Sequence, residues 1–123
     1  GNYGGSLLKM LQKAAEKIAT GQITFAARDS QVDGHNIKKG DLMALTGGKI
    51  TFVDNDLERT VLKLLKQMIK KTSQFVTVIY GEDVSENQAN EIENAIQEKF
   101  GQKVEITVIN GGQPIYYYII SVE

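Results

Sequence analysis

Apolar residues at helical spacing predict a strong amphipathic helix in the middle of the chain. One of three consecutive polar residues, Asp54, Asn55 or Asp56, can cap it, and the pattern continues to about Lys71. Its apolar positions recur at i, i+4, i+7, i+8 and i+11, namely Leu57, Val61, Leu64, Leu65 and Met68. This spacing places one apolar stripe on a helix surface, which favours packing against a sheet.

Two further helices are predicted on either side of it. Ser85 and Gln88 form a capping-box pattern for a helix that ends at Phe100. Its expected buried residues are Ala89, Ile92, Ile96 and Phe100. Near the start, Ser6 can cap a helix that Gly21 would end. Its apolar positions are Leu7, Leu8, Leu11, Ala15 and Ile18.

Short apolar and β-branched segments predict the strands. They are expected at Gln22 to Arg28, Asp41 to Leu45, Lys49 to Val53, Phe75 to Tyr80, Val104 to Ile109, and the end of the chain. Asp33-Gly34 and Gly47-Gly48 supply the turns of a long and a tight hairpin. The nearly continuous apolar run at Phe75 to Tyr80 is typical of a strand covered on both faces.

The order of these elements predicts an α+β fold that resembles an α/β sandwich. A strand, helix and strand from Phe75 to Ile109 imply a right-handed parallel crossover, and Asn110-Gly111-Gly112 would turn the chain into an antiparallel terminal hairpin. We expect a mixed sheet with about three helices and six strands. The first five residues resemble a leftover scar or a cut linker, and residues 6–123 one domain of a larger protein.

Composition narrows the function classes. The chain has 123 residues, a net charge of -1 and no cysteine, and it has no long apolar run or export signal. The charge argues against nucleic acid as a partner, and the lack of cysteine excludes disulfides and thiolate sites. We expect a cytoplasmic protein without a membrane span.

The end of the chain carries the candidate chemistry. Three of the five tyrosines are consecutive there, and tyrosine combines an apolar ring with a polar tip. Glu82 and Asp83 follow a predicted strand directly, at the carboxyl end where ligands of open sheets often bind. The expected contact residues for a partner or ligand are Tyr80, Gly81, Glu82, Asp83, Asn110, Gly111, Gly112, Gln113, Tyr116 and Tyr118. No catalytic, cofactor-binding or metal-binding residues are predicted.

Other polar features have simpler interpretations. His35 is the only histidine and lies in a polar turn without neighbouring ligands, so we interpret it as a solvated loop residue. Arg59, Lys63, Lys66 and Lys70 form a basic stripe, whereas Glu82 to Glu98 contains six acidic residues and no basic one. Such stripes are usually the solvated faces of amphipathic helices, and the alternative is a charged partner surface.

From about Ile18 to the end, the chain resembles the carboxyl-terminal domain of the ATP-binding subunit of bacterial fatty acid kinases, the YloV-like proteins of the dihydroxyacetone kinase family. The segments that carry the resemblance are Arg28-Asp29, Asp33-Gly34, Gly40-Asp41, Ile79-Tyr80-Gly81-Glu82-Asp83, Gly111-Gly112-Gln113-Pro114 and Tyr116-Tyr117-Tyr118-Ile119-Ile120-Ser121-Val122-Glu123. In element order, the chain is also loosely similar to the second domain of DegV-type fatty acid-binding proteins.

The resemblance implies a division of labour within a larger bacterial protein. An amino-terminal domain would bind ATP and Mg²⁺, and the kinase would phosphorylate an acyl group carried by a separate DegV-like subunit for phospholipid synthesis. The present region would be non-catalytic, would hold no cofactor and would engage that subunit. The DegV-type loop that meets the acyl carboxylate has no counterpart here, because the corresponding turn reads Asn110-Gly111-Gly112-Gln113-Pro114.

Three hypotheses follow. The first is a regulatory domain that docks a fatty acid-binding subunit, with exposed amides at Gly111 and Gly112, the Gln113 amide and tyrosine hydroxyls supplying orientation. The second is a small-molecule or vestigial catalytic domain, in which Glu82, Asp83 and the glycine turn surround a phosphate or acyl carboxylate in a pocket between the two loops. The third is a homodimer that forms through an exposed final strand.

Overall fold

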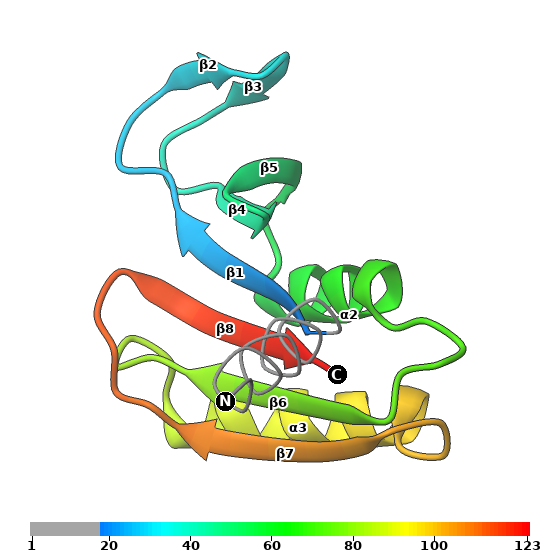
Figure 1. Ribbon diagram of the computed structural model, residues 1–123. Helices are drawn as coiled ribbons and strands as arrows, with labels where there is room; N and C mark the ends of the chain where they lie inside the picture. Colours follow the sequence, from blue (N-terminus) through cyan, green and yellow to red (C-terminus); the bar gives the residue numbers. More distant parts are fainter. Residues whose placement is uncertain (1–17) are drawn as a thin grey trace, which may run out of the picture.

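The computed structural model describes residues 18–123 as a six-stranded mixed sheet with two helices packed on it (Figure 1). The strands of this sheet are β1 (Ala19–Phe25), β4 (Leu42–Thr46), β5 (Lys49–Asp54), β6 (Phe75–Tyr80), β7 (Glu105–Asn110) and β8 (Tyr116–Val122). The helices are α2 (Leu57–Met68) and α3 (Glu86–Phe100). A small separate hairpin consists of β2 (Ser30–Val32) and β3 (His35–Ile37). The α+β class is therefore confirmed.

The last strand lies inside the sheet and not in a terminal hairpin. The strand order is β5-β4-β1-β8-β6-β7, so β8 pairs antiparallel with both β1 and β6. The expected hairpin between the last two strands is wrong, because the chain leaves β7 and crosses the end of β6 before it enters β8. An edge position for β8, which the homodimer hypothesis required, is wrong for the same reason.

The parallel crossover from β6 through α3 to β7 is confirmed. The Ser85 side chain caps α3 by accepting a hydrogen bond from the Gln88 N–H at 3.2 Å. The residues that α3 buries are the predicted ones, Ala89, Ile92, Ile96 and Phe100. Local capping and apolar spacing therefore determine this unit, and both are readable from the sequence.

The central helix is also confirmed, with Asp56 as its cap. The Asp56 side chain accepts from the Arg59 N–H, and the helix ends at Met68 because Ile69 turns to an extended conformation. The predicted end at Lys71 is therefore too late. Its buried residues are Thr60, Val61, Leu64, Leu65 and Met68.

Gly21 has a different role from the one expected. It lies within β1 and does not end a helix, and a Cβ atom at this position would lie 2.8 Å from Met68 Sδ and 3.3 Å from Leu64 Cδ2. The glycine therefore lets α2 approach the sheet closely. Most of the helix predicted from Ser6 lies outside the described residues, and β1 already begins at Ala19.

Both described helices lie behind one face of the sheet (Figure 1). Val76 and Val78 of β6 point into this core and are buried, whereas Thr77 and Ile79 on the other face are only half-buried. The described helices thus do not meet the expectation that β6 is covered on both faces. The face of β6 that these helices do not cover carries Phe75, Thr77 and Ile79, so it is only partly apolar.

The hairpin of β2 and β3 projects from the sheet (Figure 1). Asp33 and Gly34 form its turn with φ of 50° and 80°, as expected for an Asp-Gly hairpin. The sequence predicted the turn but not its two short strands. The described part of the chain thus has eight strands and two helices, compared with the six and about three that were predicted. Neither of these two helices is long and apolar enough to cross a membrane.

Candidate functional site

Two loops that are distant in the sequence meet at the carboxyl end of β6. We refer to residues 80–83 and 110–116 together as the loop pair. The Gly81 N–H donates to the Tyr117 carbonyl at 2.9 Å, and the Glu82 N–H donates to the Gln113 carbonyl at 3.0 Å. The predicted contact residues therefore lie at or beside one junction of the fold.

Glycines allow this close approach. A Cβ atom at Gly81 would lie 2.7 Å from the Gln113 carbonyl oxygen and still closer to that of Tyr116. A Cβ atom at Gly111 would collide with the Gln113 side chain and with Ile79. Because the obstacles at Gly81 are backbone atoms, a side chain at this position would separate the two loops.

The Gln113 side chain stabilises the junction through hydrogen bonds to the backbone. Its Nε2 atom donates to the Ile79 and Tyr116 carbonyl oxygens, each at 3.2 Å. One amide group thus ties the end of β6 to the start of β8. Its N–H donors are already used within the chain, and a contact between Gln113 and a partner stays a prediction.

The backbone N–H groups of Gly111 and Gly112 also form hydrogen bonds within the chain. The Gly111 and Gly112 N–H groups both donate to the Tyr80 carbonyl, at 2.9 and 3.3 Å. They were predicted to be exposed donors, and this is wrong because the chain folds back over the end of β6. A nest for a phosphate or carboxylate requires free N–H groups, so these two glycines do not supply one.

The three consecutive tyrosines have three different environments. Tyr118 is buried at 1% exposure, and its hydroxyl has no hydrogen-bond partner within the described part of the chain. Desolvation raises the pKa of this hydroxyl, and Tyr80 and Glu93 raise it further. Tyr117 packs against Phe25, with ring centroids 5.6 Å apart. Tyr116 is exposed at 39%, so it is the tyrosine of this row that is most available for contact.

Ile115 belongs to the same surface and was missed in the sequence. Its side chain is 62% exposed and its φ is 72°, a left-handed conformation that β-branched residues rarely adopt. The Ile115 carbonyl accepts a hydrogen bond from Thr24 Oγ1 at 2.9 Å, which holds the loop against β1. No local pattern marks an isoleucine for this conformation, so only the fold reveals it. Backbone strain of this kind often occurs at functional positions.

The remaining predicted residues form the polar border of the loop pair. Glu82, Asp83 and Asn110 are exposed, and Tyr80 is half-buried opposite Tyr118. Among residues 18–123, no three acidic or histidine side chains gather as a metal site would require. A surface cavity of about 670 Å³ lies at the opposite end of β6, beside Phe75, Ser73 and Glu123, and not between the loops. The two best-formed cavities among the described residues thus lie away from the loop pair.

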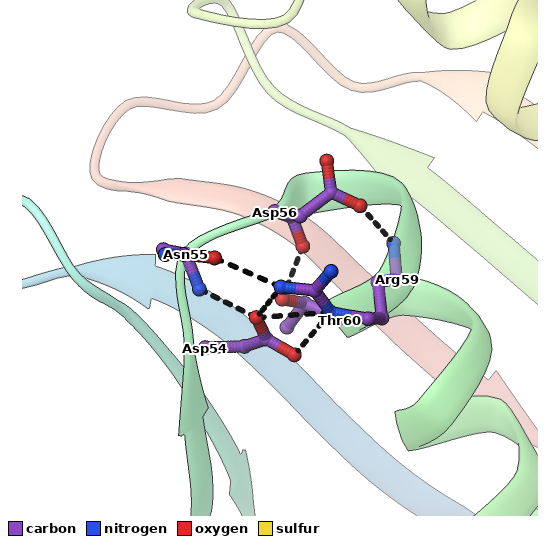
Figure 2. Close-up of polar contacts among 5 residues, drawn as sticks. All are labelled: Asp54, Asn55, Asp56, Arg59 and Thr60. Carbon is purple, nitrogen blue, oxygen red and sulfur yellow. Dashed lines mark hydrogen bonds and ion pairs between the residues drawn. The ribbon is translucent and has the colours of Figure 1, made fainter.

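The basic stripe on α2 is partly engaged in the fold (Figure 2). Arg59 Nε donates to Asp54 Oδ2 at 3.0 Å, and its Nη2 atom contacts Asp54 and Asn55. The hydrogen bond from Arg59 is the largest effect that lowers the pKa of the Asp54 carboxyl well below its ordinary value. Lys63 lies 4.6 Å from the centroid of the Phe52 ring. All four residues of the stripe are exposed, as expected for a solvated face, and at these two positions the stripe also contacts β5.

His35 occupies the projecting hairpin and is half-buried there. It pairs with Val32 across the two short strands, next to the Asp33-Gly34 turn. His35 is therefore a residue of the small hairpin and is distant in sequence from the loop pair.

Known proteins support a family assignment. The model of the FakA-like C-terminal family, which describes the carboxyl-terminal region of fatty acid kinase subunits, matches residues 5–123. Protein YloV of Bacillus subtilis is 38% identical over 110 residues, which cover 89% of this chain and 20% of that protein. Uncharacterized proteins of Staphylococcus haemolyticus and Staphylococcus aureus are 40% and 38% identical over the same shares. The chain thus spans about a fifth of the length of these relatives.

Proposed function

Because the chain belongs to the FakA-like C-terminal family of fatty acid kinase subunits, we propose that it is a docking and regulatory domain of a larger kinase subunit. In this proposal an ATP-binding domain elsewhere in the parent protein forms the acyl phosphate, in the bacterial cytoplasm. The present domain engages the DegV-like subunit that carries the fatty acid. The bond-making groups then lie outside these residues.

The observation that carries the proposal is the rigid, partly apolar surface of the loop pair. Backbone hydrogen bonds at Gly81 and Glu82 fix the two loops, so little conformational entropy would be lost on binding. Ile115 and Tyr116 stand out from this fixed frame at 62% and 39% exposure. A rigid aromatic and aliphatic anchor inside a polar border is the usual anatomy of a binding hot spot.

The orienting polar groups differ from those first expected. Since Gly111, Gly112 and Gln113 use their donors internally, orientation falls to the exposed side chains of Glu82, Asp83 and Asn110. Acidic groups at the border of an interface act mainly on the association rate. We therefore expect a partner surface with basic residues around an apolar depression.

The test is titration of this chain with a DegV-type fatty acid-binding protein from the same bacterium, loaded with fatty acid. Ile115→Gly removes the exposed side chain and also relieves the left-handed conformation, so it should lower affinity about tenfold without loss of stability. Tyr116→Ala should lower affinity similarly. Val32→Ala is the matched control, because Val32 is 40% exposed on the projecting hairpin.

Two results would overturn the proposal. The first is unchanged affinity in both loop variants. The second is formation of acyl phosphate when this chain alone is mixed with ATP, Mg²⁺ and the loaded binding protein.

A further inference from the structure

The outer edge of β7 has a row of backbone groups without a strand partner among residues 18–123. In the described structure β7 pairs with β6 alone. The Glu105 N–H donates to the Gln74 carbonyl, and the Gly111 N–H donates to the Tyr80 carbonyl. The backbone N–H and C=O groups of the odd-numbered residues of β7 therefore point toward β6 along this parallel ladder. The N–H and C=O groups of Ile106, Val108 and Asn110 therefore point away from the sheet.

The two edges of the sheet differ in how they are protected. The β5 edge begins with Lys49, has an irregular register opposite Ala44 and Leu45, and continues directly into α2. The β7 edge pairs with β6 in continuous register from Glu105 to Asn110. It has no lysine, proline or bulge, which are the features that usually block edge pairing. Thr107 and Ile109 are also exposed beside it.

The charge of the neighbouring helix distinguishes among the partners that could pair with this edge. Helix α3 lies behind β6 and β7 (Figure 1), and the segment from Glu82 to Glu98 has six acidic residues and no basic one. If two copies paired through β7, their α3 helices would lie roughly 10 Å apart, given the usual strand spacing. Repulsion between two acidic helices disfavours a second copy.

We propose that an extended segment of a partner protein, with alternating apolar and basic side chains, adds to the sheet as a strand beside β7. Main-chain hydrogen bonds to Ile106, Val108 and Asn110 hold it in place. Side chains on one face of the added strand contact Thr107 and Ile109. Those on the other face extend toward the acidic helix, where lysine or arginine is favoured.

This inference goes beyond the loop pair and does not depend on it. The β7 edge and the loop pair meet at Asn110, so a single partner could contact both, but each surface has its own variants. Ile115→Gly alters the loop pair and leaves the edge intact. Substitutions at Val108 alter the edge and leave the hydrogen bonds of the loop pair intact.

The test uses a short synthetic peptide in which lysine and valine alternate, titrated into the full chain and followed by amide NMR. The largest shift changes are expected at Ile106, Val108 and Asn110. Val108→Pro removes an outward N–H but no bond to β6, and an edge strand tolerates proline at such a position. It should weaken binding about tenfold, whereas Val108→Thr keeps the N–H and should bind normally.

Charge variants keep the test valid if Val108→Pro does not fold. Glu91→Lys and Glu98→Lys change exposed residues of α3 and should each weaken peptide binding several-fold, and a glutamate-valine peptide should not bind. Ile115→Gly should leave peptide binding unchanged. Shift changes elsewhere, equal binding of the acidic peptide, or self-association of the chain at the same amides would each overturn the inference.

Discussion

Two junctions in this molecule connect a strand to the next segment of the chain, and different kinds of interaction stabilise them. The loop pair after β6 is joined by backbone hydrogen bonds and by glycines that leave no space for a side chain. The corner between β5 and α2 is joined by the charged side chains of Asp54 and Arg59. The loop pair should therefore keep its stability in acid and in salt but lose it when Gly81 is substituted. The corner of Asp54 and Arg59 should lose its small contribution to stability in acid and in salt.

The largest expected effect is that of Gly81→Ala. The new methyl group would meet the carbonyl oxygens of Tyr116 and Gln113, which are backbone atoms and cannot rotate away. The free energy of unfolding should fall by about 3 kcal/mol. Urea unfolding measures this effect.

Gly48→Ala is the control for backbone conformation. Gly48 has a φ of 78° with open space around it, so its substitution should cost only about 1 kcal/mol. If both variants lost the same stability, close packing of the two loops would not be the reason for the glycine at Gly81.

The next effect concerns the side-chain brace of the loop pair. Gln113→Glu keeps the shape of the side chain but removes the donors that reach Ile79 and Tyr116. The free energy of unfolding should fall by about 2 kcal/mol at neutral pH, because two carbonyl oxygens then face a carboxylate. Acidification should restore part of this loss, since a protonated carboxyl can donate one hydrogen bond. A loss that does not depend on pH would contradict this account.

A smaller effect is expected at the charged corner. Asp54→Asn should lower stability by about 1 kcal/mol or less, because Arg59 is largely exposed and solvent screens the pair. The pKa of Asp54 is lowered in the folded state, so its contribution is fully present above the unfolded pKa of about 4 and is lost as the pH falls through the folded value.

Unfolding of the two proteins at several pH values and salt concentrations tests this. The difference between Asp54→Asn and the natural sequence should shrink in acid and in high salt. A difference that persisted unchanged at low pH would show that the charge of Asp54 is not what joins the corner.

The smallest effect is expected at Tyr118, whose buried hydroxyl has no hydrogen-bond partner within the described residues. Tyr118→Phe removes a hydroxyl that makes no hydrogen bond in the described structure, so stability should stay the same or rise by about 0.5 kcal/mol. Tyr116→Phe serves as the exposed control. A clear loss of stability in Tyr118→Phe alone would reveal a partner for this hydroxyl.

Local patterns predicted the units that are held together locally. Helix α3, its cap at Ser85 and its buried face follow from neighbouring residues, as does the crossover to β7. The position of β8 does not, because pairing with β1 and β6 depends on residues about a hundred and about forty positions away in the chain. The Asn110-Gly111-Gly112 segment has the composition of a hairpin turn and yet forms a crossover.

The candidate site was predictable in location but not in chemistry. Turn residues after a buried strand indicated where the loop pair would lie. Which donors remain free depends on contacts across the fold, so the prediction of exposed N–H donors at Gly111 and Gly112 was wrong, and the Gln113 donors are also used within the chain. The strained conformation of Ile115 likewise depends on tertiary contacts and has no sequence signature.

The position of β8 between β1 and β6 also has a consequence for biosynthesis. In the described sheet, β1, β4 and β5 form one half, β6 and β7 form the other, and β8 is the strand that pairs with both halves. While the ribosome is still producing the preceding residues, neither half can pair with the other, and the facing edges of β1 and β6 remain open. This strand order predicts that the sheet completes slowly and late, and that the nascent chain benefits from chaperones until β8 emerges.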